Sequence, residues 1–169
     1  MPPVQTAQFN REDVTIHLMD IHIDLSNRLE ESGPTFIAFS NHLTYVIKIP
    51  TKVKRWGMSL LQLQRTPQKQ IKPLLWTACL FLLLKPHLAR IAKETDKIAI
   101  DNEFDGYQAL IKAALLRHIW QRCDKFPQHK IVITSIGKKS LVHHTVLQAK
   151  RGRRRIDKVI RKQEMSEVL

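Results

Sequence analysis

An apolar run in the middle of the chain sets the tightest limit on its fold. The run Leu74–Leu84 is 11 residues long, carries no charge and is closed by Lys85-Pro86. A membrane-spanning helix needs about 20 apolar residues, so we interpret the run as part of a buried helix. The helical pattern begins near Gln68, and its second half is apolar on every side, so other elements must cover both sides. The chain therefore has to fold in layers around this helix.

Short segments with the composition of β-strands lie on both sides of the apolar helix. Residues 14–25 alternate between apolar and polar side chains, and a shift of phase after Leu18 indicates a bulge or two short strands. Residues 35–39 and 44–49 are rich in β-formers and are joined by a tight turn, which predicts an antiparallel hairpin. Further strands are predicted at residues 58–64, 97–101 and 130–136.

Helical patterns alternate with strands in the second half of the chain. Apolar residues spaced by three and four predict a helix that ends near Cys123, with Asp105 as its N-cap. Ser140 is predicted to cap a helix that runs through Ala149, and Thr66 to cap the apolar helix. This order of elements is typical of a mixed α/β protein.

The length of 169 residues fits one domain. We expect residues 1–12 to form a flexible arm and residues 13–150 a single α/β domain. Residues 151–169 are predicted to form a basic C-terminal helix or tail, with Ile156 and Ile160 on the helix. The two cysteines form no CxxC pair and no secretory signal is visible, so we expect a cytoplasmic location.

The chain carries a large and unevenly distributed positive charge. It has 28 Lys and Arg against 15 Asp and Glu, a formal net charge of +13. No acidic residue lies between Glu31 and Glu94 or within residues 125–156, which predicts a basic surface and a separate acidic spot. We predict DNA or RNA as the partner. A membrane surface or an acidic protein is less favoured, since the basic residues do not follow one long amphipathic helix. A solvated basic face without a partner is the remaining alternative.

Two basic segments are candidate phosphate-binding sites. Gly137-Lys138-Lys139-Ser140 follows a strand and precedes a helix, but Val132 stands where a Walker A motif needs glycine, so we exclude an NTPase. A helix N-terminus beside two lysines and a serine still suits one backbone phosphate. The arginine-rich segment that follows the helix suits a polyanion of any sequence, and Trp56 beside two cations is a candidate for base stacking. The predicted nucleic-acid-binding residues are Lys54, Arg55, Lys138, Lys139, Ser140, Arg151, Arg153, Arg154 and Arg155.

Acidic residues close the strand predicted at residues 97–101. Asp101 and Glu103 would face the same side of an extended chain. Paired carboxylates suit Mg²⁺ or Mn²⁺, and two-metal phosphodiester cleavage needs such a cluster. The alternative is that these acids cap the next helix. Asp20, His22 and Asp24 form a second polar set on one strand face, for which a metal role is conceivable.

The order of elements resembles the ribonuclease H-like superfamily. The segments that carry the resemblance are Thr35–Asn41 as the first strand, Thr44–Pro50 as the second, Lys97–Asp101 as the fourth and Ile131–Gly137 as the fifth, within residues 35–150. The resemblance implies a mixed sheet flanked by helices. It also implies nuclease, transposase, integrase or resolvase chemistry with two divalent metals.

The same resemblance implies particular site residues. It expects an aspartate on the first strand, an acid at the end of the fourth strand, and an acid or histidine in the last helix. Asp101 matches the second of these, with Glu103 beside it, and His144 or its neighbour His143 matches the third. Asn41 stands where the aspartate is expected, so the third metal ligand is either this amide or a carboxylate from Asp20 or Asp24.

We therefore predict a nucleic-acid-binding protein with Mg²⁺- or Mn²⁺-dependent phosphodiester cleavage or strand transfer. The predicted catalytic residues are Asp101, Glu103 and His144, and the predicted metal ligands are Asp101, Glu103 and Asn41. A degenerate site would leave the alternative, a non-catalytic DNA- or RNA-binding module.

Overall fold

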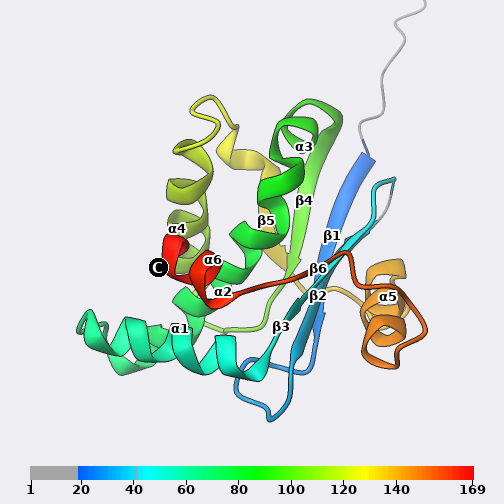
Figure 1. The fold of residues 1–169 in the computed structure, drawn as a ribbon. Helices are drawn as coiled ribbons and strands as arrows, with labels where there is room; N and C mark the ends of the chain where they lie inside the picture. The colour runs from blue at the N-terminus through cyan, green and yellow to red at the C-terminus, as the bar shows by residue number, and fades with distance from the viewer. Residues whose placement is uncertain (1–18, 41) are drawn as a thin grey trace, which may run out of the picture.

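The computed structural model describes residues 19–40 and 42–169 and shows a mixed six-stranded sheet flanked by helices (Figure 1). The strand order is β5-β4-β1-β2-β3-β6. This confirms the α/β class and the mixed sheet. The strands are β1 Met19–Ser26, β2 Thr35–Ser40, β3 Tyr45–Ile49, β4 Thr95–Asp101, β5 Ile131–Thr134 and β6 Lys158–Val159.

The sheet combines an antiparallel half with a parallel half. β1 pairs antiparallel with β2, and β2 with β3, so the predicted hairpin is confirmed. β4 runs parallel to both β1 and β5, with Ile23 of β1 opposite Ile100 of β4. The carboxyl ends of β1 and β4 therefore lie side by side in the middle of the sheet.

Helices cover the two faces of the sheet unequally. α5 packs alone against β1 and β2 on one face, while α1, α2, α4 and α6 lie on the other (Figure 1). The alternation of side chains along β2 explains both layers, since Phe36 packs in the small core under α5 and Ile37 in the main core. The helices are α1 Thr51–Leu63, α2 Gln68–Leu84, α3 Leu88–Glu94, α4 Gln108–Trp120, α5 Leu141–Lys150 and α6 Lys162–Val168, with 3₁₀ turns at Lys85–His87 and Gln128–Lys130.

The predicted apolar helix is confirmed as α2, the central element of the main core. Its side chains from Leu75 through Leu84 are all buried. By length and composition alone, the helical stretch Gln68–Glu94 could cross a membrane, but 67% of its most apolar window is buried inside the fold. That degree of burial is what a core helix shows.

The strand predicted at residues 58–64 is wrong, because these residues belong to α1. The buried residues of α1 are spaced by one, three and four positions, which places them on one face of a helix but on both faces of a strand: Val53, Lys54, Gly57 and Leu61. A glycine within the helix allows close packing, since a Cβ on Gly57 would come within 2.6 Å of Leu75 Cδ1.

Several predicted helix starts are also corrected. α4 begins at Gln108 with Tyr107 as its N-cap, because Gly106 has a φ of 82° and the side chain of Asp105 instead accepts a hydrogen bond from Asn102 Nδ2 at 2.6 Å. α2 has Pro67 as its N-cap, in place of Thr66.

The end of the chain does not form the single basic helix that was expected through Ile156 and Ile160. Residues 158–159 form β6, which adds to β3 as an edge strand. Asp157 explains this pairing, because its Oδ2 accepts a hydrogen bond from the Val46 N–H at 2.7 Å. α6 then packs against α1 and α2, with Met165 fully buried. The predicted arm at residues 1–12 lies outside the described residues.

Candidate functional site

Three carboxylates from two neighbouring strands meet at the centre of the sheet. Asp24 and Asp101 follow directly after the paired residues Ile23 and Ile100, so the parallel register sets them side by side. Glu103 lies just beyond the end of β4. One oxygen from each of the three carboxylates lies within 4.8 Å of the others. We call Asp24, Asp101 and Glu103 the acidic cluster.

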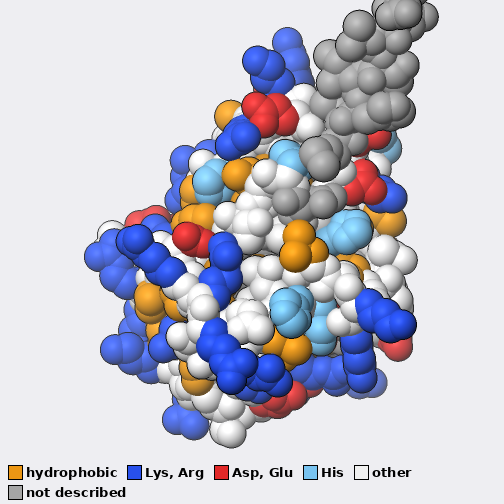
Figure 2. All heavy atoms as spheres, turned by 90° about the vertical axis from the view of Figure 1, so that its right-hand side faces the viewer, with side chains coloured by type: hydrophobic (Ala, Val, Ile, Leu, Met, Phe, Trp, Pro, Cys, Tyr) orange, Lys and Arg blue, Asp and Glu red, His pale blue; other side chains and the backbone are white. Residues whose placement is uncertain are grey.

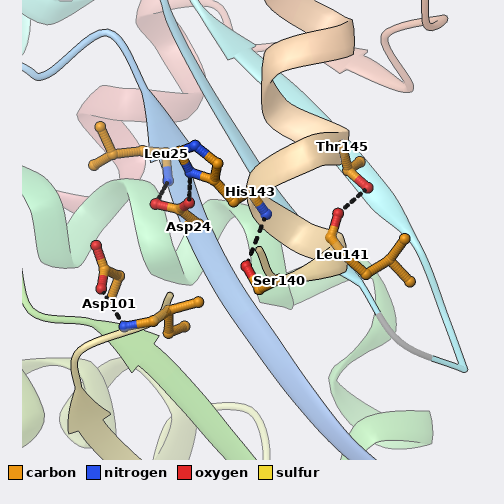
Figure 3. Close-up of polar contacts among 8 residues, drawn as sticks. Asp24, Leu25, Asp101, Ser140, Leu141, His143 and Thr145 are labelled. Carbon is orange, nitrogen blue, oxygen red and sulfur yellow. Dashed lines mark hydrogen bonds and ion pairs between the residues drawn. The ribbon is translucent and has the colours of Figure 1, made fainter. Parts of the chain in front are cut away.

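Hydrogen bonds fix the orientation of the two aspartates (Figure 3). Asp24 Oδ1 accepts the Leu25 N–H at 2.7 Å, and its Oδ2 lies 2.8 Å from Nδ1 of His143. Asp101 Oδ1 accepts the N–H of Ile136, in the loop after β5, at 2.7 Å. The carboxylates are therefore held by three different elements before any ligand binds.

The first turn of α5 supplies the histidine. Ser140 caps this helix as predicted, because its side-chain oxygen accepts the His143 N–H at 3.2 Å. His143 points from this turn toward Asp24, and 26% of its side chain is exposed (Figure 3). His144 is exposed, since adjacent helical residues point in directions about 100° apart. Of the two candidate histidines, His143 is the one that contacts the acidic cluster.

Burial and neighbouring carboxylates raise the pKa of two members of the cluster, Asp24 and Glu103. Burial of Glu103, its hydrogen bond with Asp101 and the negative charge of Asp101 raise its pKa from 4.5 to about 7. Arg28 opposes this rise, with Nε 3.4 Å from Glu103 Oε2. Burial also raises the pKa of Asp24, against hydrogen bonds from His143 and Leu25. A bound cation would relieve this repulsion, so the cluster fits a hard metal ion.

The predicted phosphate-binding residues lie at both ends of α5. Lys138 and Lys139 are exposed just before its N-terminus, beside the turn that carries His143, whereas Arg151, Arg153 and Arg155 are exposed beyond its C-terminus. The ten residues of α5 separate the two groups by about 15 Å. Figure 2 shows the face that α5 presents, with Lys and Arg side chains along its lower and left margins and histidines near its centre.

The other predicted residues are half-buried, are used within the fold, or lie across the sheet on α1. Arg154 is half-buried, and Ser140 uses its hydroxyl oxygen to cap α5. Arg55 is exposed on α1, across the sheet. Lys54 is only 1% exposed, and its ammonium donates to the Glu31 carbonyl at 2.9 Å. Its predicted contact with phosphate is therefore corrected, because the charged group faces the loop between β1 and β2.

The resemblance took Thr35–Asn41 as its first strand, although residues 14–25 were also predicted to contain a strand. Thr35–Ser40 is the second strand of the sheet, and β1 precedes it. Asn41, the predicted third ligand, lies outside the described residues, and Asp24 of β1 supplies the third carboxylate of the cluster. The alternating set Asp20, His22 and Asp24 was the signal that pointed to this strand.

Comparison with protein-family models, with curated proteins and with solved structures finds no match to this chain.

Proposed function

We propose that this chain is a nucleic-acid-binding protein of ribonuclease H-like type that cleaves or transfers phosphodiester bonds with Mg²⁺ or Mn²⁺. The observation that carries the proposal is the acidic cluster, whose three ligand oxygens lie within 4.8 Å of one another. Its position also matters, because the cluster lies at the carboxyl ends of two central parallel strands, where ligands commonly bind in α/β sheets.

The order of elements supports the ribonuclease H-like type. Three antiparallel strands are followed by helices, a parallel strand, a helix, a second parallel strand and α5. Asp24 then occupies the first-strand position that the resemblance implies, Asp101 the end of the fourth strand, and His143 the helix after the fifth. The expected aspartate is present on β1, so the site does not depend on Asn41.

Asp24, Asp101 and Glu103 would hold the metal, because Mg²⁺ and Mn²⁺ prefer carboxylate oxygens. A divalent ion bound there would stabilise negative charge on the attacking and leaving oxygens of a phosphodiester. His143 fixes the Asp24 carboxylate through its 2.8 Å contact. Lys138 and Lys139 would hold a neighbouring phosphate at the N-terminus of α5, where the helix dipole favours negative charge.

A non-catalytic DNA- or RNA-binding module is the second candidate. It is favoured by the internal charge compensation of the cluster, in which Glu103 contacts Arg28 and Asp24 contacts His143. Because these contacts balance part of the negative charge, the same geometry also fits a structural role for the three carboxylates.

Cleavage assays separate the two candidates. The protein is incubated with Mg²⁺ or Mn²⁺ and single-stranded, duplex or RNA–DNA hybrid substrates. We expect cleavage that Asp101→Asn lowers at least about 100-fold, since loss of a ligand exceeds the 10- to 100-fold effect of disturbing a residue behind a ligand. Asp96→Asn is the matched control, because Asp96 is exposed at the opposite end of β4.

Two outcomes contradict the catalytic proposal. One is the absence of cleavage on all three substrates with both metals, and the other is cleavage that Asp101→Asn leaves unchanged. Salt-dependent binding without cleavage supports the second candidate, because each phosphate contact releases counterions and steepens the dependence of affinity on salt.

A further inference from the structure

A basic groove is formed by α1 and the first residue of α6. Both helices lie across the sheet from α5 (Figure 1). We call this groove the α1–α6 groove. Its volume is about 450 Å³. The lining residues are Thr51, Lys52, Arg55, Trp56, Ser59 and Lys162.

The charge of the α1–α6 groove is not compensated within the described chain. Half of its lining residues are cations and none is acidic. Lys52, Arg55 and Lys162 form no ion pair with any residue in 19–40 or 42–169. Cations gathered without counter-charges repel one another, and an anionic ligand relieves that repulsion.

The start of α1 adds to this positive potential. α1 has 13 residues, its N-cap Pro50 provides no side-chain hydrogen bond, and its first turn contains no acidic residue. The positive end of the helix dipole at Thr51 is therefore not neutralised by its own side chains. Unpaired N–H groups at such an end favour a phosphate.

Trp56 gives the α1–α6 groove an aromatic surface of fixed orientation. Trp56 is 38% exposed. Nε1 donates a hydrogen bond to Ser166 Oγ at 2.8 Å, and Lys162 Nζ lies 5.0 Å from the ring centroid. These contacts hold the ring before a ligand arrives, so stacking on it costs little conformational entropy.

We propose that the α1–α6 groove binds single-stranded nucleic acid, with an unpaired base stacked on Trp56 and its phosphates held by Lys52, Arg55 and Lys162. A positively charged groove with an aromatic platform is how proteins bind single strands with little sequence preference. Duplex is disfavoured, because paired bases are stacked on each other and do not offer a face to the ring. The site is independent of the acidic cluster, which lies across the sheet.

Tryptophan fluorescence tests the stacking. A 12-nucleotide oligothymidylate is titrated into the full chain in EDTA, so that metal-dependent cleavage does not contribute. We expect quenching that is lost in Trp56→Phe and retained in Trp120→Phe, a matched control because Trp120 is 40% exposed on α4. Quenching that persists in Trp56→Phe, or that disappears only in Trp120→Phe, overturns the proposal.

Charge reversal tests the phosphate contacts without relying on the tryptophan. The double variant Lys52→Glu/Arg55→Glu is compared with Lys69→Glu/Lys72→Glu, which changes the net charge equally at exposed positions of α2. Lys52→Glu places an acid in the first turn of α1, where the helix dipole favours negative charge. Weaker binding by this variant would therefore not reflect unfolding of α1.

We expect the groove variant to bind at least about 10-fold more weakly than the control variant. Its slope of log affinity against log salt should be smaller by about 1.4, because each phosphate contact to a single strand contributes about 0.7. Equal losses of affinity in the two variants overturn the proposal, as does tighter binding of a 12-base-pair duplex than of the single strand.

Discussion

Neutralising Glu103 should make the metal-free protein more stable at alkaline pH, although the change removes one member of an ion pair. The Glu103 side chain is 10% exposed, and its contact with Arg28 at 3.4 Å does not offset burial and the adjacent Asp101. These effects raise its pKa from 4.5 to about 7. The folded protein therefore binds the Glu103 proton more tightly than the unfolded chain does.

The sign and size of the effect follow from proton linkage. Below pH 4.5 Glu103 is protonated in both states, so it adds no pH dependence. Between pH 4.5 and about 7 the unfolded chain loses this proton first, so the free energy of unfolding falls as pH rises. Above pH 7 the full penalty applies, and it is about 3 kcal/mol because each pKa unit corresponds to about 1.4 kcal/mol.

Urea unfolding in EDTA at several pH values between about 4.5 and 8 measures this penalty. At pH 8 we expect Glu103→Gln to be more stable than the natural chain by about 2 to 3 kcal/mol, and near pH 4.5 the two should differ little. Mg²⁺ should stabilise the natural chain at pH 8 and stabilise Glu103→Gln less, because binding to the folded state alone raises its stability.

Glu94→Gln is the control for this experiment. The hydrogen bond from Arg90 lowers the pKa of Glu94, so neutralising it should slightly reduce stability at pH 8, the opposite sign. If Glu103→Gln is less stable than the natural chain at pH 8, or keeps the same dependence on pH, then burial and the adjacent Asp101 do not raise the pKa of Glu103.

Two further substitutions test the packing that supports the sites. Gly57→Ala should destabilise the protein by about 1 to 3 kcal/mol in urea unfolding, since its Cβ would lie 2.6 Å from Leu75 Cδ1. The control Ser59→Ala, on the exposed side of α1, should change stability by less than about 0.5 kcal/mol. Lys54→Met should lower the free energy of unfolding by about 2 kcal/mol, because it leaves the carbonyls of the β1–β2 loop without their buried donor. Lys52→Met, at an exposed neighbouring position, should be nearly neutral. Equal effects at the two lysines would show that Lys54 does not stabilise this loop.

Local patterns predicted most of the sheet and failed where the signals were weak. β2, β3 and α2 were identified because their apolar residues have a clear period or a clear length. α1 was missed in part because it begins without a side-chain cap or an acidic first turn. Without that start signal, the sequence does not connect residues 58–64 with Val53 and Gly57. The buried face that these residues share in α1 is therefore not apparent from the sequence.

The acidic cluster shows a different limit of sequence reasoning. Asp101 and Glu103 are near neighbours in the chain, so their shared role was predicted. Asp24 joins them only through the parallel pairing of β1 with β4, and it contacts His143 across 119 residues of sequence. No local pattern specifies which strands pair across such a distance, so Asp24 remained one of several alternatives.

Part of the net charge of +13 is buried and cannot contact a ligand. Lys54 and Lys130 are buried, and their ammonium groups bind backbone carbonyls, as in the 2.8 Å contact of Lys130 with Ala92 O. Lys54 stabilises the loop between β1 and β2, and Lys130 stabilises the junction of α3 and β4, so neither charge is accessible to a polyanion. Two groups of accessible cations lie at the ends of α5 and along the α1–α6 groove, on opposite faces of the sheet, and others such as Lys69 and Lys72 of α2 lie outside both groups. A short oligonucleotide cannot contact both faces at once, and of the two groups only the one around α5 adjoins the acidic cluster.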